Sequence, residues 1–453
     1  MFAFIHNAKP GDLIPYLEGY YNVRSGATTF FTTSLFACQA ISTPLGALLS
    51  KKIGFRWSAI LSIFLTSGGI LFSIFTIKYG LIYLIFTCSI MFGFGIGAAY
   101  SVLYAVSTAW FLDNRSLVVG IIASGLGLGA LVFVPLQTYI INPNNVDDLF
   151  SPQVTERVPL AFLVLGGLIL CLQIIGFALL REKERDLDIH IEPSIMASQD
   201  FADLKEEMKD PHRNYSTLEA LRTIDFYLAF FINFFNSASV GLISCTVKVY
   251  GIDAGFDKLF MATILTCCAI FNCLGRITWG YFGDRFSFKG PMTVLQIEWA
   301  LLWFTYPYVT MPTGITGKAL FTIWNFLLYS CIAGNFVLIP NLATRVFGPK
   351  NMPTIFGLIF AAMAPSNLIL SVIFSNFDIR SYWKEIYSIG GFFAIIGLVL
   401  LIFVRDPNVR CVPCFTPAMR VCDCLRIPDK EKVILEQLKG ALNGGTFKED
   451  FAT

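Results

Sequence analysis

Long apolar runs without charge constrain this chain more than any other feature of its sequence. Of the 453 residues, 55% are hydrophobic and only 14% are charged, whereas an ordinary soluble domain has roughly a quarter of its residues charged. A water-soluble fold of this length would need that charge to cover its surface. Lipid must cover much of the surface instead, so the sequence predicts an integral membrane protein.

Eleven of these runs are long enough to cross a bilayer, whose apolar core needs about 20 residues in a helix. Only helices or closed barrels satisfy backbone groups in lipid, and the runs are too long and too continuously apolar for barrel strands. The predicted fold class is therefore an all-α integral membrane protein. The expected helices span residues 28–50, 58–77, 80–104, 116–140, 158–180, 224–247, 258–282, 291–310, 316–340, 353–376 and 383–404.

Basic residues gather on alternate loops of this arrangement, and hence on one face of the membrane. The positive-inside rule places that face in the cytosol, together with the polar segment 181–222 and the tail after Val404. The basic residues of the shorter loops on this face are Lys51, Lys52, Arg56, Arg115, Arg285, Lys289, Arg345 and Lys350. We expect a multi-pass protein of the plasma membrane or of an organelle, with a cytosolic C-terminus.

The residues before the first complete helix fit this topology as part of one more helix. The orientation puts the start of segment 28–50 outside, so a preceding helix should enter from the cytosol. Met1 to Tyr21 contains Pro10, Gly11 and Pro15 and is too short to span. We expect it to be the outer remnant of a first helix whose beginning is absent. The alternative is an eleven-helix protein with an external N-terminus.

Segment 181–222 divides the chain into two halves. The predicted organisation is an N-terminal transmembrane half over 1–180 with a partial first helix, a cytosolic central loop over 181–222, a C-terminal transmembrane half over 223–404 and a cytosolic tail over 405–453. The central loop mixes acidic and basic residues and is interpreted as a solvated linker. Equal halves joined by a cytosolic loop are the layout of many secondary transporters.

A loop motif recurs after the second helix of each half and indicates a duplicated six-helix unit. The two copies contain Gly46, Lys51 and Arg56, and Gly280, Asp284, Arg285 and Lys289. Both resemble the G-x-x-x-D-R-x-G-R loop of the major facilitator superfamily. The resemblance implies the major facilitator fold and a cytosolic latch between its halves. The first copy departs from the pattern, because Ser50 stands where Asp is usual.

A narrower resemblance covers most of the chain from Leu35 to Phe374. Its segments include Gly93-Phe-Gly95-Ile-Gly97-Ala-Ala-Tyr100, Trp110-Phe111, Gly125-x-Gly127-x-Gly129 and Asn272-Cys-Leu-Gly275-Arg276-Ile-Thr-Trp279-Gly280. They are similar to the oxalate/formate antiporter branch and its relatives, the monocarboxylate transporters. The resemblance implies an antiporter or symporter of small organic anions, most readily monocarboxylates, and no enzymatic activity.

Arg276 is the strongest candidate for a substrate-binding residue. It lies eight positions before Asp284, or about 12 Å along a helix, which is close to the midplane of a core about 30 Å thick. A cation there costs several kcal/mol and is a functional hypothesis by default. A guanidinium pairs with a carboxylate through two hydrogen bonds. The family resemblance implies the same role; the alternative is a structural ion pair.

Glu298 is the candidate partner for that ion pair. It lies nine residues after Lys289, about 13 Å into its helix. It could neutralise Arg276 between substrates, or carry a coupling proton, since burial raises the pKa of a carboxyl group. The third interpretation is a polar contact between helices.

Met363 narrows the expected substrate class, because the resemblance aligns it with a second substrate-binding cation of some relatives. In relatives that carry dicarboxylates, a Lys on helix eleven meets the second carboxylate, and here Met363 stands at that position. One cation for one substrate charge favours a monocarboxylate over a dicarboxylate such as oxalate. Asn272, Tyr100 and Tyr329 are further candidates for the wall of the binding site, although each also fits an interhelical hydrogen bond.

Other classes of function find less support. A membrane sensor or scaffold that keeps the fold without transport stays open, because the first helix is incomplete and one loop Asp is missing. An intramembrane enzyme has no support, since the three His residues lie outside the complete apolar runs. No metal, cofactor or nucleic acid is expected; the partners are lipid, a small anion and protons or a counter-anion. The tail contains four thiols, Cys411, Cys414, Cys422 and Cys424. Zinc binding and palmitoylation are possible roles for them, but reduced, unmodified cysteine is the preferred interpretation.

Overall fold

The computed structural model describes residues 17, 20–21, 25–111, 114–143, 151–181, 214–376 and 382–406. Most of the expected first-helix remnant and the four tail cysteines lie outside these residues. Every element of secondary structure in the described ranges is a helix. The all-α prediction is confirmed.

Two long helices of the described part before the central loop are joined by a single residue. Gly54 links them with a φ of 83°, a conformation that favours glycine. The elements are α3 (Ser25–Ile53), α4 (Phe55–Thr76), α5 (Leu81–Ile85), a π-helical turn (Phe86–Met91), α6 (Phe92–Thr108), α7 (Arg115–Ile141), α8 (Pro152–Thr155) and α9 (Val158–Leu179).

The helices after the central loop include three whose first N–H groups are capped by side chains. Asp257 accepts from the backbone N–H groups of Leu259 and Phe260, and Thr223 accepts from that of Phe226. The elements are α11 (Thr217–Leu221), α12 (Ile224–Asp253), α13 (Lys258–Arg285), α14 (Lys289–Thr305), a 3₁₀ turn (Tyr306–Tyr308), α15 (Gly314–Phe347), α16 (Met352–Phe360), α17 (Met363–Asn376) and α18 (Trp383–Phe403).

Each of the eleven predicted ranges coincides with helix, with three local differences. The range 80–104 contains the π-helical turn, 353–376 is broken between α16 and α17, and 291–310 stops being α-helical at Thr305. Eight helical stretches are long and apolar enough to cross a membrane, and α7 contributes two shorter apolar stretches. The chain is therefore a multi-pass membrane protein, while the count of eleven complete spans stays a prediction.

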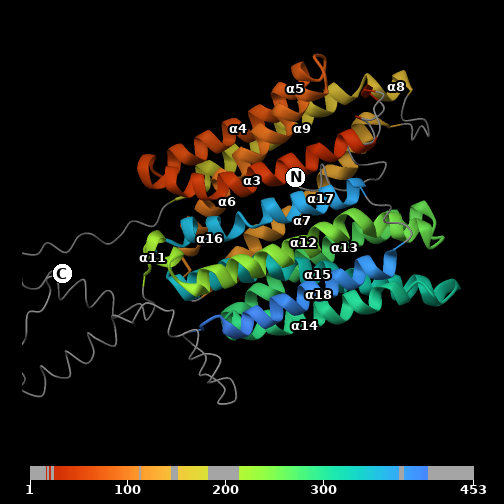
Figure 1. Cartoon of the computed structure of the whole chain (residues 1–453). Coiled ribbons are helices and arrows are strands. Elements are labelled where there is room, and N and C mark those ends of the chain that lie inside the picture. Colours follow the sequence, from red (N-terminus) through yellow and green to blue (C-terminus); the bar gives the residue numbers. More distant parts are fainter. Residues whose placement is uncertain are drawn as a thin grey trace, which may run out of the picture.

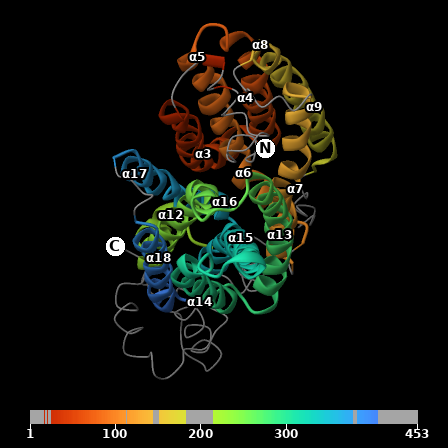
Figure 2. The same cartoon turned by 90° about the vertical axis from the view of Figure 1, so that its right-hand side faces the viewer.

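The helices form two bundles that lie side by side (Figures 1 and 2). One bundle contains α3, α4, α6 and α9, and the other contains α12, α13, α14, α15 and α18. Two seams join them: α7 packs along α13, and α3 packs along α16 and α17. Large apolar side chains such as Phe64, Phe75 and Leu301 are exposed on the outer faces, where lipid would cover them.

The end of the predicted central loop is less solvated than expected, because its described part packs on the C-terminal bundle. The backbone N–H of Tyr215 donates to the carbonyl of Phe347 at 2.9 Å, and their rings meet edge to face. A capping box of Ser216 and Glu219 starts α11. The strap from residue 214 to Thr223 thus follows the turn between α15 and α16.

Candidate functional site

Arg276 on α13 is the only buried Lys or Arg in the part of the chain that the structure describes, with 5% of its surface exposed. Its Nε donates to Oδ1 of Asn272 at 3.0 Å. The amide of Asn272 in turn donates to the carbonyl of Tyr329 on α15 at 3.0 Å. The ring of Phe336 lies 5.0 Å from the guanidinium carbon, within the range of a cation–π interaction.

The guanidinium keeps hydrogen-bonding capacity that this structure leaves unused. Its Nη1 is buried and makes no hydrogen bond. Every partner of Arg276 among the described residues is uncharged. A buried cation without a counter-ion is costly, so the arrangement favours an anion that arrives from outside the chain.

An aromatic cluster lies beside this cation and joins the two bundles. We use the name for Tyr100 and Tyr104 of α6, Phe336 of α15, and Phe356 and Phe360 of α16. The Tyr100 ring lies 4.7 Å from that of Tyr104 and 5.4 Å from that of Phe360, measured between centroids. The Tyr100 hydroxyl also lies close to the Arg276 guanidinium. A residue of the first bundle therefore meets the cation of the second.

The remaining predicted site residues are not gathered around Arg276. Tyr329 contributes its backbone carbonyl, while its side chain lies near Cys245 and Cys268. Met363 is buried at the start of α17, one turn beyond Phe360. Glu298 is half-buried on α14 and contacts the thiol of Cys331 on α15. The geometry supports the third interpretation of Glu298, a polar contact between helices.

The second copy of the loop motif lies at the seam between α7 and α13. The carboxylate of Asp284 accepts the backbone N–H groups of Ser116 at 2.9 Å and Leu117 at 2.8 Å. These are unpaired donors of the first turn of α7, and the helix dipole favours a negative charge there. Gly280 lets the two backbones approach, since a Cβ there would lie 2.6 Å from the carbonyl oxygen of Ser116.

Within the described residues, the hydrogen bonds of Lys289 from this copy lie inside the C-terminal bundle. Arg285 is exposed. The ammonium of Lys289 donates to the carbonyls of Ile402 at 3.0 Å and Val404 at 2.7 Å, at the C-terminus of α18, where a cation is favourable. Lys289 therefore joins α14 to α18 within one bundle.

The first copy of the motif makes a weaker connection at the other seam. The ammonium of Lys51 donates to Oδ1 of Asn351 at 2.9 Å, just before α16. Gly46 lies against the backbone of Ala98 within its own bundle. Arg56 stacks on its neighbour Phe55, with the guanidinium carbon 5.9 Å from the ring centroid. No carboxylate of this copy caps α16, in agreement with Ser50 at the usual Asp position.

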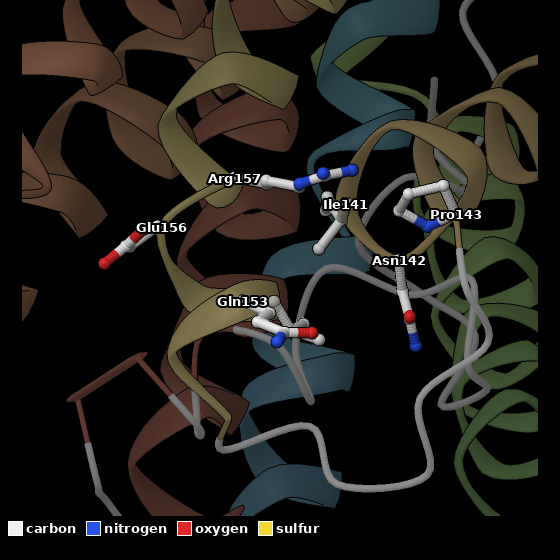
Figure 3. A pocket seen from close by; sticks show the side chains of 7 residues that line it. Ile141, Asn142, Pro143, Gln153, Glu156 and Arg157 are labelled. Carbon is white, nitrogen blue, oxygen red and sulfur yellow. The ribbon is translucent and has the colours of Figure 1, made fainter.

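Two cavities are alternatives to the Arg276 region as a binding site. One of about 400 Å³ lies at the end of α7 and the start of α9 and does not include Arg276. In Figure 3, Arg157 and Gln153 extend across it, whereas Glu156 points away. The other is a small cavity between α12, α15 and α16 that shares Phe336 and Phe360 with the surroundings of Arg276.

Sequence reasoning missed the residues that complete the site. Phe336 and Tyr104 could not be distinguished from the many other aromatic residues in apolar runs. Asn233 and Asn236 are three residues apart on α12, a spacing that places polar groups on one helix face. That pattern was the available signal for the small cavity, which Asn233 and Asn236 line.

Comparison with known proteins identifies the family of this chain. The family model described as Major Facilitator Superfamily matches residues 11–369. Apicoplast pyruvate carrier 1 of Toxoplasma gondii is 24% identical over 437 residues, which cover 88% of this chain and 77% of that protein. The oxalate:formate antiporter of Oxalobacter formigenes is 23% identical and covers 69% and 67%. Monocarboxylate transporter 12 of Homo sapiens is 23% identical and covers 85% and 74%.

Solved structures show the same fold. The transporter FucP in the outward conformation superimposes with a TM-score of 0.63 at 14% identity, covering 87% of this chain and 94% of FucP. The proton:xylose symporter XylE gives a TM-score of 0.60 at 14% identity, with coverages of 89% and 93%. The resemblance to the oxalate/formate and monocarboxylate branch is confirmed by the relatives above. The chain belongs to the major facilitator superfamily of membrane transporters.

Proposed function

We propose that this chain is a secondary active transporter of small organic anions, most readily monocarboxylates, which works by alternating access around Arg276. The observation that carries the proposal is the buried guanidinium, whose Nη1 has no partner. A carboxylate can pair with a guanidinium through two parallel hydrogen bonds. Tyr100 from the other bundle lies beside the same cation, so an anion bound there would interact with both halves.

The relatives support anions as the substrate class. Their names refer to pyruvate, to oxalate and formate, and to monocarboxylates. A monocarboxylate is favoured over a dicarboxylate here because Met363, and no cation, stands at the predicted second position. Transport of the substrate would be coupled either to protons or to a counter-anion.

The proposed transport cycle uses the two seams as gates. The halves are taken to be residues 1–180 and 223–404, with the loop 181–222 and the tail 405–453 in the cytosol. In that orientation the Asp284 contacts with α7 lie on the cytosolic side, so this conformation is closed toward the cytosol. Inward opening would break those contacts. The membrane in question is the plasma membrane or that of an organelle.

Uptake into proteoliposomes tests the proposal. The purified chain, with Arg276→Gln and Arg276→Lys beside it, is supplied with labelled formate, pyruvate, lactate and oxalate across a pH gradient. We expect monocarboxylate uptake that Arg276→Gln reduces at least tenfold. Arg276→Lys should restore only part, since lysine lacks the planar fork. The exposed Arg285→Gln is the matched control and should transport normally.

Three results would contradict the proposal. Robust oxalate exchange would remove the preference for one carboxylate. Lactate or pyruvate uptake unaffected by Arg276→Gln would remove Arg276 from the site. Binding of these anions by the wild-type chain without uptake would favour the sensor or scaffold alternative.

A further inference from the structure

Glu298 of α14 is an ionisable group inside the apolar core that the proposed transport site does not use. It lies nine residues after Lys289, about 13 Å along the helix and near the midplane of a core about 30 Å thick. We propose that Glu298 is the docking point for a transmembrane helix of a second protein, one that carries Lys or Arg at the same depth. The inference does not rest on the proposed function, because the side chain beside Glu298 is Cys331 and not Arg276.

Glu298 lies at the margin of an exposed apolar surface. The helix α14 is at the outer edge of the C-terminal bundle, where it packs on α18 and α15 (Figure 2). Val294, Ile297 and Leu301 of this helix are exposed, and we call these three residues the α14 face. Glu298 is four residues after Val294 and three before Leu301, which places it beside both on the helix surface. Since Glu298 is only half-buried, its carboxyl group can contact a molecule that covers the α14 face.

The described residues give this carboxyl group a weak partner and no cation. The thiol of Cys331 on α15 lies beside it, and a thiol is a weak hydrogen-bond donor and acceptor. No Lys, Arg or His of the described residues pairs with Glu298. Acidic groups at this depth are costly and rare, and they pair with other groups or face the interior of a bundle. Glu298 has only the thiol and lies partly at the outer surface, so its position favours a cation from outside the chain.

The internal repeat indicates that the fold itself does not require this carboxyl group. The helix α14 follows the second copy of the loop motif, and α4 (Phe55–Thr76) follows the first copy. The two helices also pack alike, α14 on α18 and α4 on α9. Between Arg56 and Lys78 the sequence has no Asp, Glu, Lys, Arg or His. The same place in the six-helix unit is therefore built without an ionisable group, and Glu298 needs an explanation other than packing.

A second copy of this chain does not provide the missing cation. Arg276 is buried, and the other Lys and Arg side chains of the described residues lie near helix ends. Amines of lipid headgroups lie at the interface, about 15 Å from the midplane. A helix of another protein with a basic residue at its centre supplies the cation at the right depth. Pairing would offset the cost that each charge has in lipid.

The neighbouring helix extends the surface on which such a partner would pack. Ile323 and Leu327 of α15 are exposed, and Leu327 lies one turn before Cys331. The indole N–H of Trp324 donates to the hydroxyl of Thr305 at 2.8 Å, which joins α15 to the end of α14. The α14 face and these two residues of α15 thus form one apolar surface with the carboxyl group between them.

Model transmembrane peptides provide the test. The probe is a helix of leucine and alanine, about 23 residues long, with a single Lys at its centre. The matched peptides have Gln at the centre, or the Lys at one end. Energy transfer between the labelled full-length chain and labelled peptide measures association in phosphatidylcholine vesicles. The variant is Glu298→Gln, and the control is Glu385→Gln, which removes an exposed carboxyl group at the start of α18.

We expect the wild-type chain to bind the central-Lys peptide at least tenfold more tightly than either matched peptide. Glu298→Gln should remove this preference, whereas Glu385→Gln should keep it. Thermal unfolding of the two variants in detergent verifies that both are folded. Equal binding of the central-Lys and central-Gln peptides by the wild-type chain would overturn the proposal, whatever the behaviour of the variants. A preference that persists in Glu298→Gln would also overturn it, as would energy transfer between two copies of the chain that depends on Glu298.

Discussion

A methyl group at Gly120 of α7 would lie 2.3 Å from the carbonyl oxygen of Arg276 on α13. The residue proposed to bind the substrate therefore lies where two helices of different bundles make backbone contact. The other seam has a corresponding contact, because a Cβ at Gly357 of α16 would lie 2.7 Å from the backbone nitrogen of Pro44 on α3. Both contacts are closer than any side chain allows, so each seam requires glycine at this level.

Substitution of Gly120 tests whether the α7–α13 contact controls transport. Gly120→Ala should destabilise the cytosol-closed state by about 1–3 kcal/mol through overpacking and lower the midpoint of thermal unfolding. Gly125→Ala on the same helix meets nothing within 4 Å and should be neutral or stabilising, because alanine favours helix. Thermal unfolding in detergent and initial uptake rates measure both effects. Equal behaviour of the two variants would contradict the role of close contact.

Removal of the Asp284 carboxylate should loosen the same seam from its end. Asp284→Ala leaves two N–H groups of α7 without acceptors, which costs about 1 kcal/mol and shifts the closed state about fivefold toward opening. Spin labels at positions 114 and 286 would report a larger fraction of long distances. Arg285→Gln is the control and should leave the distance distribution as in the wild type. A distribution unchanged by Asp284→Ala would exclude this residue from the latch.

Asn351 joins three segments at the second seam, and its loss should free the strap from residue 214 to Thr223. Its Oδ1 accepts from Lys51, and its Nδ2 donates to the carbonyl of Tyr215 at 2.7 Å. Asn351→Ala should speed hydrogen exchange in α11, whereas Lys51→Met should leave that exchange unchanged because the Tyr215 contact remains. Faster hydrogen exchange in both variants would mean that the position of the strap depends on the contact between Lys51 and Asn351 across the seam.

Glu298 provides a test of how transport is coupled. It contacts Cys331 on a helix of its own bundle, and α14 packs mainly on α18 and α15. We expect Glu298→Gln to retain both Arg276-dependent uptake and its response to a pH gradient. Uptake as a function of external pH, with Arg276→Gln as the inactive reference, measures this. Loss of the pH response alone would identify Glu298 as the proton carrier.

The positions of the helices could be predicted because lipid imposes a simple rule on sequence. A helix that crosses the membrane needs a long apolar run, and each predicted range coincides with helix. The interruptions were not predictable from hydropathy. The π-helical turn Phe86–Met91 and the break at Ala361 and Ala362 lie inside uniformly apolar sequence. At both interruptions, packing against neighbouring helices determines the backbone geometry.

The site was predictable only where charge or a motif marked it. Arg276 was conspicuous because a cation is costly at that depth, and Asp284 because a loop motif contained it. Tyr329 takes part through its backbone carbonyl, which accepts from Asn272, and a backbone group of this kind leaves no mark in the sequence. Ser237 and Asn335 gave no signal, since single polar residues occur throughout the apolar helices. Only the packing of α12 on α15 brings them to one cavity.

The unequal loops after α3 and α13 bear on the order of events during a transport cycle. One seam ends in a carboxylate that accepts two backbone N–H groups, and the other ends in a single exposed hydrogen bond from Lys51. Because these two sets of hydrogen bonds differ in strength, we expect the weaker one to break first. We expect separation to begin along α3 and α16 and to reach α7 and α13 last, so that the halves peel apart from one edge. The barrier to the cycle would then reside at Asp284, at the end of α13 and about 12 Å along that helix from Arg276.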